Sequence, residues 1–231
     1  MKKTLIFTLV FMPILTCFSE ITGHWEFNGT LNATIGQNLE WAWEQGDASF
    51  DTTDTFGISD INGKPANVLN FTDSDDLSDF VGIEVPHGAE LDEDSWLLHE
   101  YSIILDLLYP EDSTASIRAL VSNEYLGQAK IKINESDKVG GASFHGKISA
   151  NTWHRVAIVV SHSNKTLTYY IDGAKVGEEP IGGLVDGQGK HSLEDFFYLF
   201  TTNGLSKGGY INSLQFNNCS LIHISEPTRR Y

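Results

Sequence analysis

Short β-strand patterns separated by turn residues run through most of this chain, and they constrain its fold more than any other feature. The clearest unit spans Trp153–Gly177. Its apolar run 153–160 is followed by a polar turn and by the alternating stretch 167–171, and the dipeptide Asp172-Gly173 then precedes residues 175–177. Two such runs joined by Asp-Gly are typical of an antiparallel hairpin. The unit therefore predicts a three-stranded meander.

Strand patterns of the same kind recur on both sides of this meander. They lie at residues 25–27, 39–43, 68–71, 82–85, 101–109, 115–121, 129–133, 143–147, 196–201 and 209–216. The total is on the order of twelve strands. Only Ser192–Phe196 suggests helix, as a single turn with Ser192 as N-cap. Many short strands without helices predict an all-β fold, a two-layer antiparallel β-sandwich of the jelly-roll type.

The two ends of the sequence differ from the region between them. Residues 1–19 combine an early positive charge with a short apolar run that ends in Cys17-Phe18-Ser19, which predicts a signal peptide cleaved before Glu20. Lipidation of Cys17 is an alternative. Residues 220–231 resemble a translated sequencing adaptor and are interpreted as a non-native tail. We therefore expect one domain over 20–219, secreted or at the cell surface, with the periplasm as an alternative location.

Acidic residues outnumber basic residues by about two to one. The 231-residue chain has 31 Asp and Glu against 15 Lys and Arg, a formal charge of −16. Such a charge repels phosphates and anionic membranes, so we expect no nucleic-acid partner and no membrane insertion after signal cleavage. Of the two cysteines, Cys17 leaves with the signal peptide and Cys219 adjoins the tail. A domain without a disulfide is expected.

Three segments carry a family resemblance. They are His99–Ile103, then Asn151–Ala157 followed by Tyr169–Gly173, and finally Gly209–Phe216. Through them the chain resembles the concanavalin A-like lectin/glucanase superfamily, and within it the bacterial laminin G-like domains, over Gly23–Asn217. The resemblance implies a jelly-roll sandwich. It does not fix the function, because that fold hosts lectins, adhesion modules, hydrolases and lyases.

One acidic segment can be compared with the catalytic carboxylates of a glycosidase. In a strand, the alternation of Glu90–Asp94 would direct Glu90, Asp92 and Asp94 into one cleft, as the catalytic strands of such enzymes do. The same alternation would bury Glu93, which costs several kcal/mol without a partner. We therefore predict a solvated loop and no catalytic residue.

The histidines give no catalytic pattern either. His154 and Arg155 lie in the strongest strand without a serine elbow or a metal-binding histidine pair, so we expect them to pair within the sheet. His87 and His191 are interpreted as isolated loop histidines.

Sugar recognition needs an exposed aromatic side chain beside carboxylates or amides. Trp96 follows Asp92 and Asp94 in a polar segment, and these three residues are the predicted ligand-binding site. The remaining tryptophans are assigned to the core: Trp25, Trp41, Trp43 and Trp153.

A second acidic segment contains hard oxygen ligands within one short turn. Asp73, Asp75 and Asp76 are the candidate ligands for Ca²⁺, which prefers 6–8 oxygens. The spacing of an EF-hand is absent, and an exposed acidic loop is the alternative.

Together these features predict a secreted, non-catalytic binding or adhesion module whose partner is a glycan or an extracellular protein. A polysaccharide hydrolase or lyase of the same fold is one alternative. A structural accessory domain of a larger, truncated protein is the other.

Overall fold

The computed structural model describes residues 20–43, 45–73, 82–123, 129–185, 187–201 and 206–219. The predicted signal peptide and the adaptor-like tail lie outside these described residues and stay predictions. Glu20 immediately precedes the first strand and forms two hydrogen bonds with Asn218. The N–H of Glu20 donates to Asn218 Oδ1 at 3.0 Å, and the N–H of Asn218 donates to Glu20 O at 3.1 Å.

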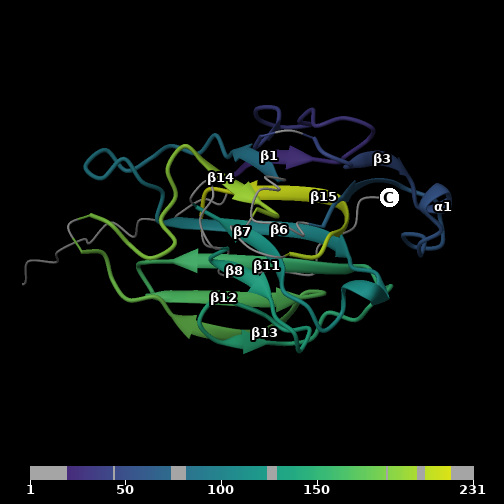
Figure 1. Ribbon diagram of the computed structural model, residues 1–231. Helices are drawn as coiled ribbons and strands as arrows, with labels where there is room; N and C mark the ends of the chain where they lie inside the picture. The colour runs from purple at the N-terminus through teal and green to yellow at the C-terminus, as the bar shows by residue number, and fades with distance from the viewer. Residues whose placement is uncertain are drawn as a thin grey trace, which may run out of the picture.

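Two antiparallel sheets form the domain, as the strand pattern predicts (Figure 1). The larger sheet contains β1 (Ile21–Trp25), β3 (Ser49–Thr52), β4 (Asn67–Phe71), β6 (Glu100–Leu108), β11 (His154–Ser161), β12 (Thr166–Ile171), β13 (Ala174–Pro180) and β15 (Gly209–Asn217). Its order is β13-β12-β11-β6-β15-β4-β3, and β1 also pairs with β15. The prediction of an all-β, two-layer sandwich is confirmed.

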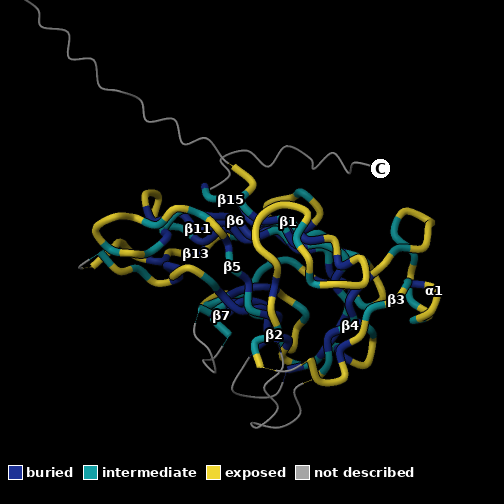
Figure 2. The backbone as a smooth tube through the Cα atoms, turned by 90° about the horizontal axis from the view of Figure 1, so that it is seen from above, coloured by how far each residue is buried: buried dark blue, intermediate teal, exposed yellow. Residues whose placement is uncertain are grey.

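The smaller sheet has the order β10-β9-β8-β7-β14-β5-β2. Its strands are β2 (Glu40–Trp41), β5 (Ile83–Pro86), β7 (Arg118–Ser122), β8 (Ile131–Ile133), β9 (Val139–Gly140), β10 (Phe144–His145) and β14 (Phe196–Leu199). Figure 2 shows the layers edge-on, with β15, β6 and β11 in one layer and β5, β7 and β2 in the other. Exposed residues lie mainly in the loops at the rim.

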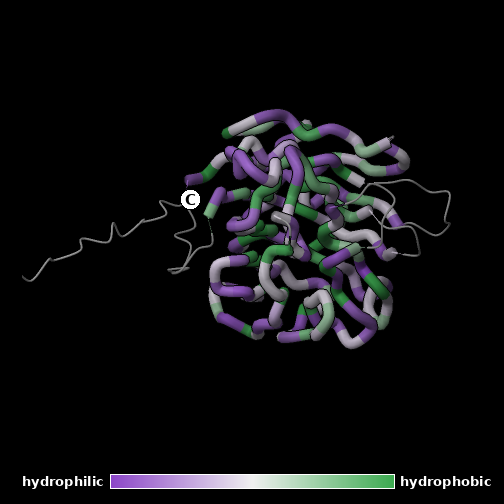
Figure 3. Tube along the Cα trace, turned by 90° about the vertical axis from the view of Figure 1, so that its left-hand side faces the viewer, coloured by the Kyte–Doolittle hydropathy of each residue, from purple (hydrophilic) through white to green (hydrophobic). Residues whose placement is uncertain are grey.

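Alternating side chains of the two sheets fill the space between the layers. Along β6, Ile103, Leu105 and Leu107 are fully buried, and Leu214 and Phe216 of β15 pack with them in one core cluster. Hydrophobic and hydrophilic residues accordingly alternate along the chain in Figure 3. Burial of these faces removes apolar surface from water, which is the main stabilising term for a fold of this kind.

The meander forms as predicted, and its turn explains the Asp-Gly dipeptide. Asp172 and Gly173 have φ of 52° and 82°, the left-handed conformation that a two-residue turn between twisted strands requires. His154 Nδ1 lies 2.7 Å from Asp172 Oδ2, and Arg155 binds Asp106 through two nitrogens, with Nε 2.7 Å from Oδ1. The expectation that His154 and Arg155 pair within the sheet is therefore confirmed.

Some local predictions are wrong. Ser192–Phe196 is not helical: Leu193 forms a β-bridge with Leu98, and Phe196 begins β14. The α-helix that the described residues do contain is α1 (Thr53–Phe56), in which Thr52 Oγ1 accepts from the N–H of Thr55. A short 3₁₀ turn spans Glu111–Ser113.

Two tryptophans and one cysteine also depart from expectation. Trp43 is 66% exposed, and Trp153 is half-buried with its indole N–H donating to Ser59 O at 2.7 Å, whereas Trp25 is in the core as predicted. Cys219 is buried and disulfide-bonded, so the expectation of a domain without a disulfide is wrong. Cys17, the other cysteine of the sequence, lies outside the described residues.

A buried carboxylate joins the edges of the two sheets. Glu179 on β13 is 2% exposed, and it accepts from the N–H groups of Gly141, Ala142 and Ser143 at 3.0, 2.8 and 2.8 Å. These three residues connect β9 to β10 at the edge of the smaller sheet. The hydroxyl of Tyr169 donates to the same carboxylate. We call this group of contacts the Glu179 clasp.

Candidate functional site

Two long loops meet at one end of the sandwich. One spans residues 87–99 between β5 and β6, and the other spans 181–195 between β13 and β14; both leave the sheets on the left side of Figure 1. Leu98 and Leu193 join them by reciprocal backbone hydrogen bonds of 2.7 and 3.0 Å. Residues about a hundred positions apart are thereby fixed side by side.

His87 holds the base of both loops, so its interpretation as an isolated loop histidine is wrong. The ring is buried, its Nδ1 accepts from the N–H of Ala89 at 3.1 Å, and Nε2 is 2.5 Å from Glu194 O. Because Nδ1 accepts, Nε2 carries the proton and donates. Burial lowers the pKa of His87 below its ordinary value, which keeps the ring neutral.

A chain of side-chain hydrogen bonds runs from the first loop into the sandwich. Ser95 Oγ is 2.9 Å from His99 Nε2, and His99 Nδ1 is 2.8 Å from Ser192 Oγ. Ser192 Oγ also lies 3.4 Å from His162 Nε2. The backbone carbonyl of His191 accepts a hydrogen bond from Tyr101 OH at 2.6 Å. His191, predicted to be an isolated loop histidine, is therefore buried and bonded within the fold.

Asp92 shapes the loop tip. Its Oδ1 accepts from the N–H of Asp94 at 3.1 Å, and from the N–H and the Oγ of Ser95 at 2.9 and 3.0 Å. These bonds from Ser95 and Asp94 lower the pKa of Asp92 and keep it ionised. Asp92 therefore positions the turn that carries Trp96.

Trp96 stands at the tip of this turn with 74% of its surface exposed. Its φ is 58°, a conformation that a bulky side chain rarely adopts. The N–H of Trp96 bonds to Asp92 O at 2.9 Å and the N–H of Asp92 to Leu97 O at 3.1 Å, and both hold the turn. An exposed indole fixed on a braced turn is available to a ligand without much loss of conformational freedom.

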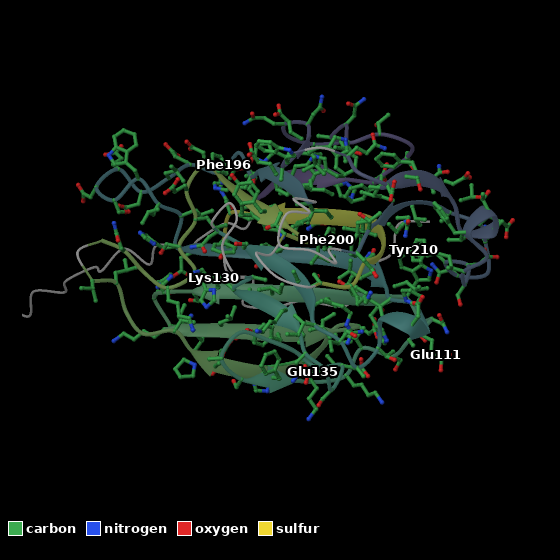
Figure 4. The ribbon with its side chains drawn as sticks, in the orientation of Figure 1. Glu111, Lys130, Glu135, Phe196, Phe200 and Tyr210 are labelled. Atoms are coloured by element: carbon green, nitrogen blue, oxygen red, sulfur yellow. The ribbon has the colours of Figure 1, made fainter. Side chains whose placement is uncertain are left out.

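The two loops enclose an open depression of about 880 Å³. Its lining residues are Ala89, Glu90, Leu91, Asp92, Glu93, Ser95, Trp96, Leu97, Gln188, Glu194 and Asp195. Trp96 and Asp92 of the predicted site are among them, whereas Asp94 is exposed outside the lining. Figure 4 labels Phe196, which directly follows Glu194 and Asp195 in the chain.

Sequence reasoning did not assign Gln188, Glu194 or Asp195 to this site. They reach it only through the Leu98–Leu193 bridge, and no motif in the sequence marks that pairing. The segment Glu90–Asp94 is an exposed loop rather than a strand, and Glu93 is exposed. The prediction of a solvated loop is therefore confirmed.

Asp73, one of the predicted calcium ligands, lies away from the Trp96 depression. Asp73 accepts from Lys207 Nζ through one oxygen and from the N–H of Gly208 at 2.6 Å through the other. It lines a second depression, of about 560 Å³, with Tyr210. Asp75 and Asp76 lie outside the described residues, and no group of three or more potential metal ligands occurs within the described part of the chain. Calcium binding stays a prediction.

No protein-family model and no curated protein sequence matches this chain. None of the helices among the described residues is long and apolar enough to cross a membrane.

Solved structures do match. Domain 4 of AbnA, an extracellular arabinanase of family GH43 from Geobacillus stearothermophilus in complex with arabinotriose, has 16% identity and a TM-score of 0.56, covering 87% of this chain and 94% of that chain. The binding domain of botulinum neurotoxin serotype D has 13% identity and a TM-score of 0.51, covering 87% and 49%. Trypanosoma rangeli sialidase with the inhibitor DANA has 10% identity and a TM-score of 0.51, covering 87% and 31%.

The chain thus spans under half the length of the toxin and sialidase chains and nearly all of the arabinanase domain. At these identities the likeness shows the fold alone: this chain is a two-layer antiparallel β-sandwich of the kind found in these proteins.

Proposed function

We propose that this domain is an exported, non-catalytic carbohydrate-binding module of the concanavalin A-like, laminin G-like type, and that the Trp96 depression is its binding site. The observation that carries the proposal is the exposed indole of Trp96, braced on a turn at the mouth of a depression lined by carboxylates. An indole stacks on the apolar face of a sugar ring, while the carboxylates accept hydrogen bonds from sugar hydroxyls and the Gln188 amide can both accept and donate.

The likeness to the arabinanase domain supports this proposal. That domain is similar over almost its whole length and was solved with a bound oligosaccharide, arabinotriose. The similar part of the neurotoxin is its binding domain. Because an extracellular protein could also occupy an exposed aromatic site, protein binding is the outcome to be separated by experiment.

The carboxylate arrangement supports binding over hydrolysis. Glycosidases place an acid and a second carboxylate on either side of the scissile bond. In this depression the acids stand on two irregular loops, and Asp92 already accepts three hydrogen bonds from its own turn. The carboxylate of Asp92 therefore stabilises the turn rather than acting as a catalytic acid or nucleophile.

A glycan array followed by calorimetric titration tests the proposal. Trp96→Ala should weaken binding of an array-positive oligosaccharide at least tenfold, because it removes the stacking surface without disturbing the core. Trp43→Ala is the matched control, since Trp43 is also highly exposed but does not line the depression. Equal effects of both variants, or no glycan binding at all, would contradict the proposal.

Two further measurements address the alternatives. Incubation with a panel of polysaccharides should release no products; release that Asp92→Asn abolishes would favour a hydrolase or lyase. Export is tested by the mass of the protein recovered from the culture medium, which should begin at Glu20; cleavage there removes Cys17, the other cysteine of the sequence, so the recovered protein should carry Cys219 as a thiol. A mature chain that retains Cys17 would contradict cleavage at this position.

A further inference from the structure

All the charged residues that line the Trp96 depression are acidic. It contains the carboxylates of Glu90, Asp92, Glu93, Glu194 and Asp195, contributed by both loops, and it contains no lysine or arginine. Lys190 lies in the second loop but is not part of the lining. The charge of the whole chain, −16, has the same sign and adds to the local field.

Four of these carboxylates are not engaged by other groups. Within the described residues, the side chains of Glu90, Glu93, Glu194 and Asp195 make no hydrogen bond or ion pair, in contrast to Asp92. The titratable ring near Asp195 is His87, whose burial lowers its pKa, so it supplies no compensating charge at neutral pH. The depression therefore presents about four uncompensated negative charges to whatever enters it.

Charge of one sign around an aromatic platform favours a particular class of sugar. A glycan that carries carboxylates or sulfates meets like charges as it loses its hydration, which is unfavourable. A glycan with protonated amino groups meets opposite charges, and an ammonium group over the face of Trp96 gains a cation–π interaction in addition. A neutral glycan gains the stacking contact and hydrogen bonds to its hydroxyls, but no attraction between opposite charges.

We infer that the Trp96 depression selects glycans that carry free amino groups and discriminates against acidic glycans. This inference rests on the proposed function, and it adds the substrate class. The pairing of an exposed indole with unengaged carboxylates in one depression carries it, since an acidic surface without the aromatic platform would attract any cation.

Titration calorimetry with three oligosaccharides of equal length provides the test. Fully deacetylated glucosamine hexamer, its N-acetylated counterpart and a galacturonate hexamer are titrated into the full-length protein at pH 6 in 20 mM NaCl. The glucosamine hexamer should bind at least tenfold more tightly than the acetylated hexamer, and the galacturonate hexamer most weakly. In 300 mM NaCl the ratio of the affinities for the glucosamine and acetylated hexamers should fall severalfold, because salt screens exposed charges.

Charge variants separate a local effect from the net charge of the protein. Glu90→Gln combined with Glu93→Gln should reduce the preference for the amino sugar about threefold or more, because glutamine keeps a hydrogen-bonding oxygen but removes the charge, and it should weaken binding of the amino hexamer more than binding of the acetylated hexamer. Glu135→Gln combined with Glu111→Gln is the matched control, since both residues are exposed, do not line the depression, and lie away from the labelled Phe196 in Figure 4. These controls should leave the preference unchanged.

Four outcomes would overturn the inference. Equal binding of the galacturonate and glucosamine hexamers would exclude selection by charge. Equally tight, Trp96-independent binding of a lysine hexapeptide would reduce the effect to a general attraction of cations. If the acetylated hexamer binds through Trp96 with no preference for the amino form, this inference fails while the proposed function stands, whereas absence of binding by any glycan overturns both.

Discussion

The Glu179 clasp gives the sharpest test of how the two sheets are held together. The carboxylate is buried and accepts from three successive N–H groups and from the Tyr169 hydroxyl. Hydrogen bonds to a charged group contribute about 1.5–3 kcal/mol each. Glu179→Gln keeps one oxygen but turns an amide N–H toward one or more donors, so we expect a loss of about 3 kcal/mol of unfolding free energy.

For a domain of this size that loss corresponds to a decrease of roughly 6–12 °C in the melting temperature. Differential scanning calorimetry at pH 7 measures it. Tyr169→Phe should cause a smaller decrease, because it removes one donor and leaves the backbone contacts intact. Glu178→Gln is the matched control: its neighbouring carboxylate pairs with Lys175 at the surface, so no resolvable change is expected. A Glu179→Gln variant that melts within 1 °C of the wild type would refute the reasoning.

The same clasp predicts a pH dependence with a definite sign. Burial alone would raise the pKa of Glu179, but the hydrogen bonds from Tyr169, Ser143, Ala142 and Gly141 outweigh it, and the folded pKa lies below the ordinary value. The stabilisation is therefore complete above the unfolded pKa of about 4.3 and is lost as the pH falls through the folded pKa. The difference between wild type and Glu179→Gln should narrow below about pH 4.

Three further predictions concern other ionisable side chains that are buried or partly buried. Burial lowers the pKa of His191 to about 4, so the unfolded chain takes up a proton more readily than the folded protein below pH 6.5. The free energy of unfolding should therefore fall by about 3 kcal/mol between pH 6.5 and pH 4. Urea unfolding at pH 7 and pH 4.5 measures this loss, and His191→Gln should reduce it. Asp137→Asn should cost about 3–5 kcal/mol in thermal unfolding, because it leaves the fully buried Arg118 without its partner. Arg155→Lys should cost about 1–2 kcal/mol in the same assay, because a lysine cannot bind Asp106 through two nitrogens.

Much of the fold follows from short-range signals in the sequence. The long strands β6, β11 and β15 lie within a residue or two of their predicted bounds, because alternation and flanking turns specify them locally. The strand β9 has only two residues and offers no periodicity, so it was not predicted. Ser192–Phe196 has the residues of a helical start, but pairing of Leu193 with Leu98 outweighs that local preference.

The candidate site was predictable only in its first half. Trp96 and its acidic neighbours stand out because an aromatic residue in a polar, turn-rich segment has no core to occupy. Glu194 and Asp195 come from a loop about a hundred residues later, and only the tertiary pairing of the loops places them beside Trp96. That Asp92 stabilises the turn could not be predicted from the sequence either, since a carboxylate in such a segment can either bind a ligand or accept hydrogen bonds from the turn.

The position of β15 has a consequence for how the protein is made. This last strand lies between β6 and β4 and also pairs with β1, so without it the larger sheet exists only as separate pieces. A ribosome that has released everything through β14 has therefore delivered exposed, unpaired strand edges rather than a partly finished domain. Formation of the complete larger sheet must wait for residues 209–217, and a chaperone that covers the earlier strands until then would protect the nascent chain from aggregation.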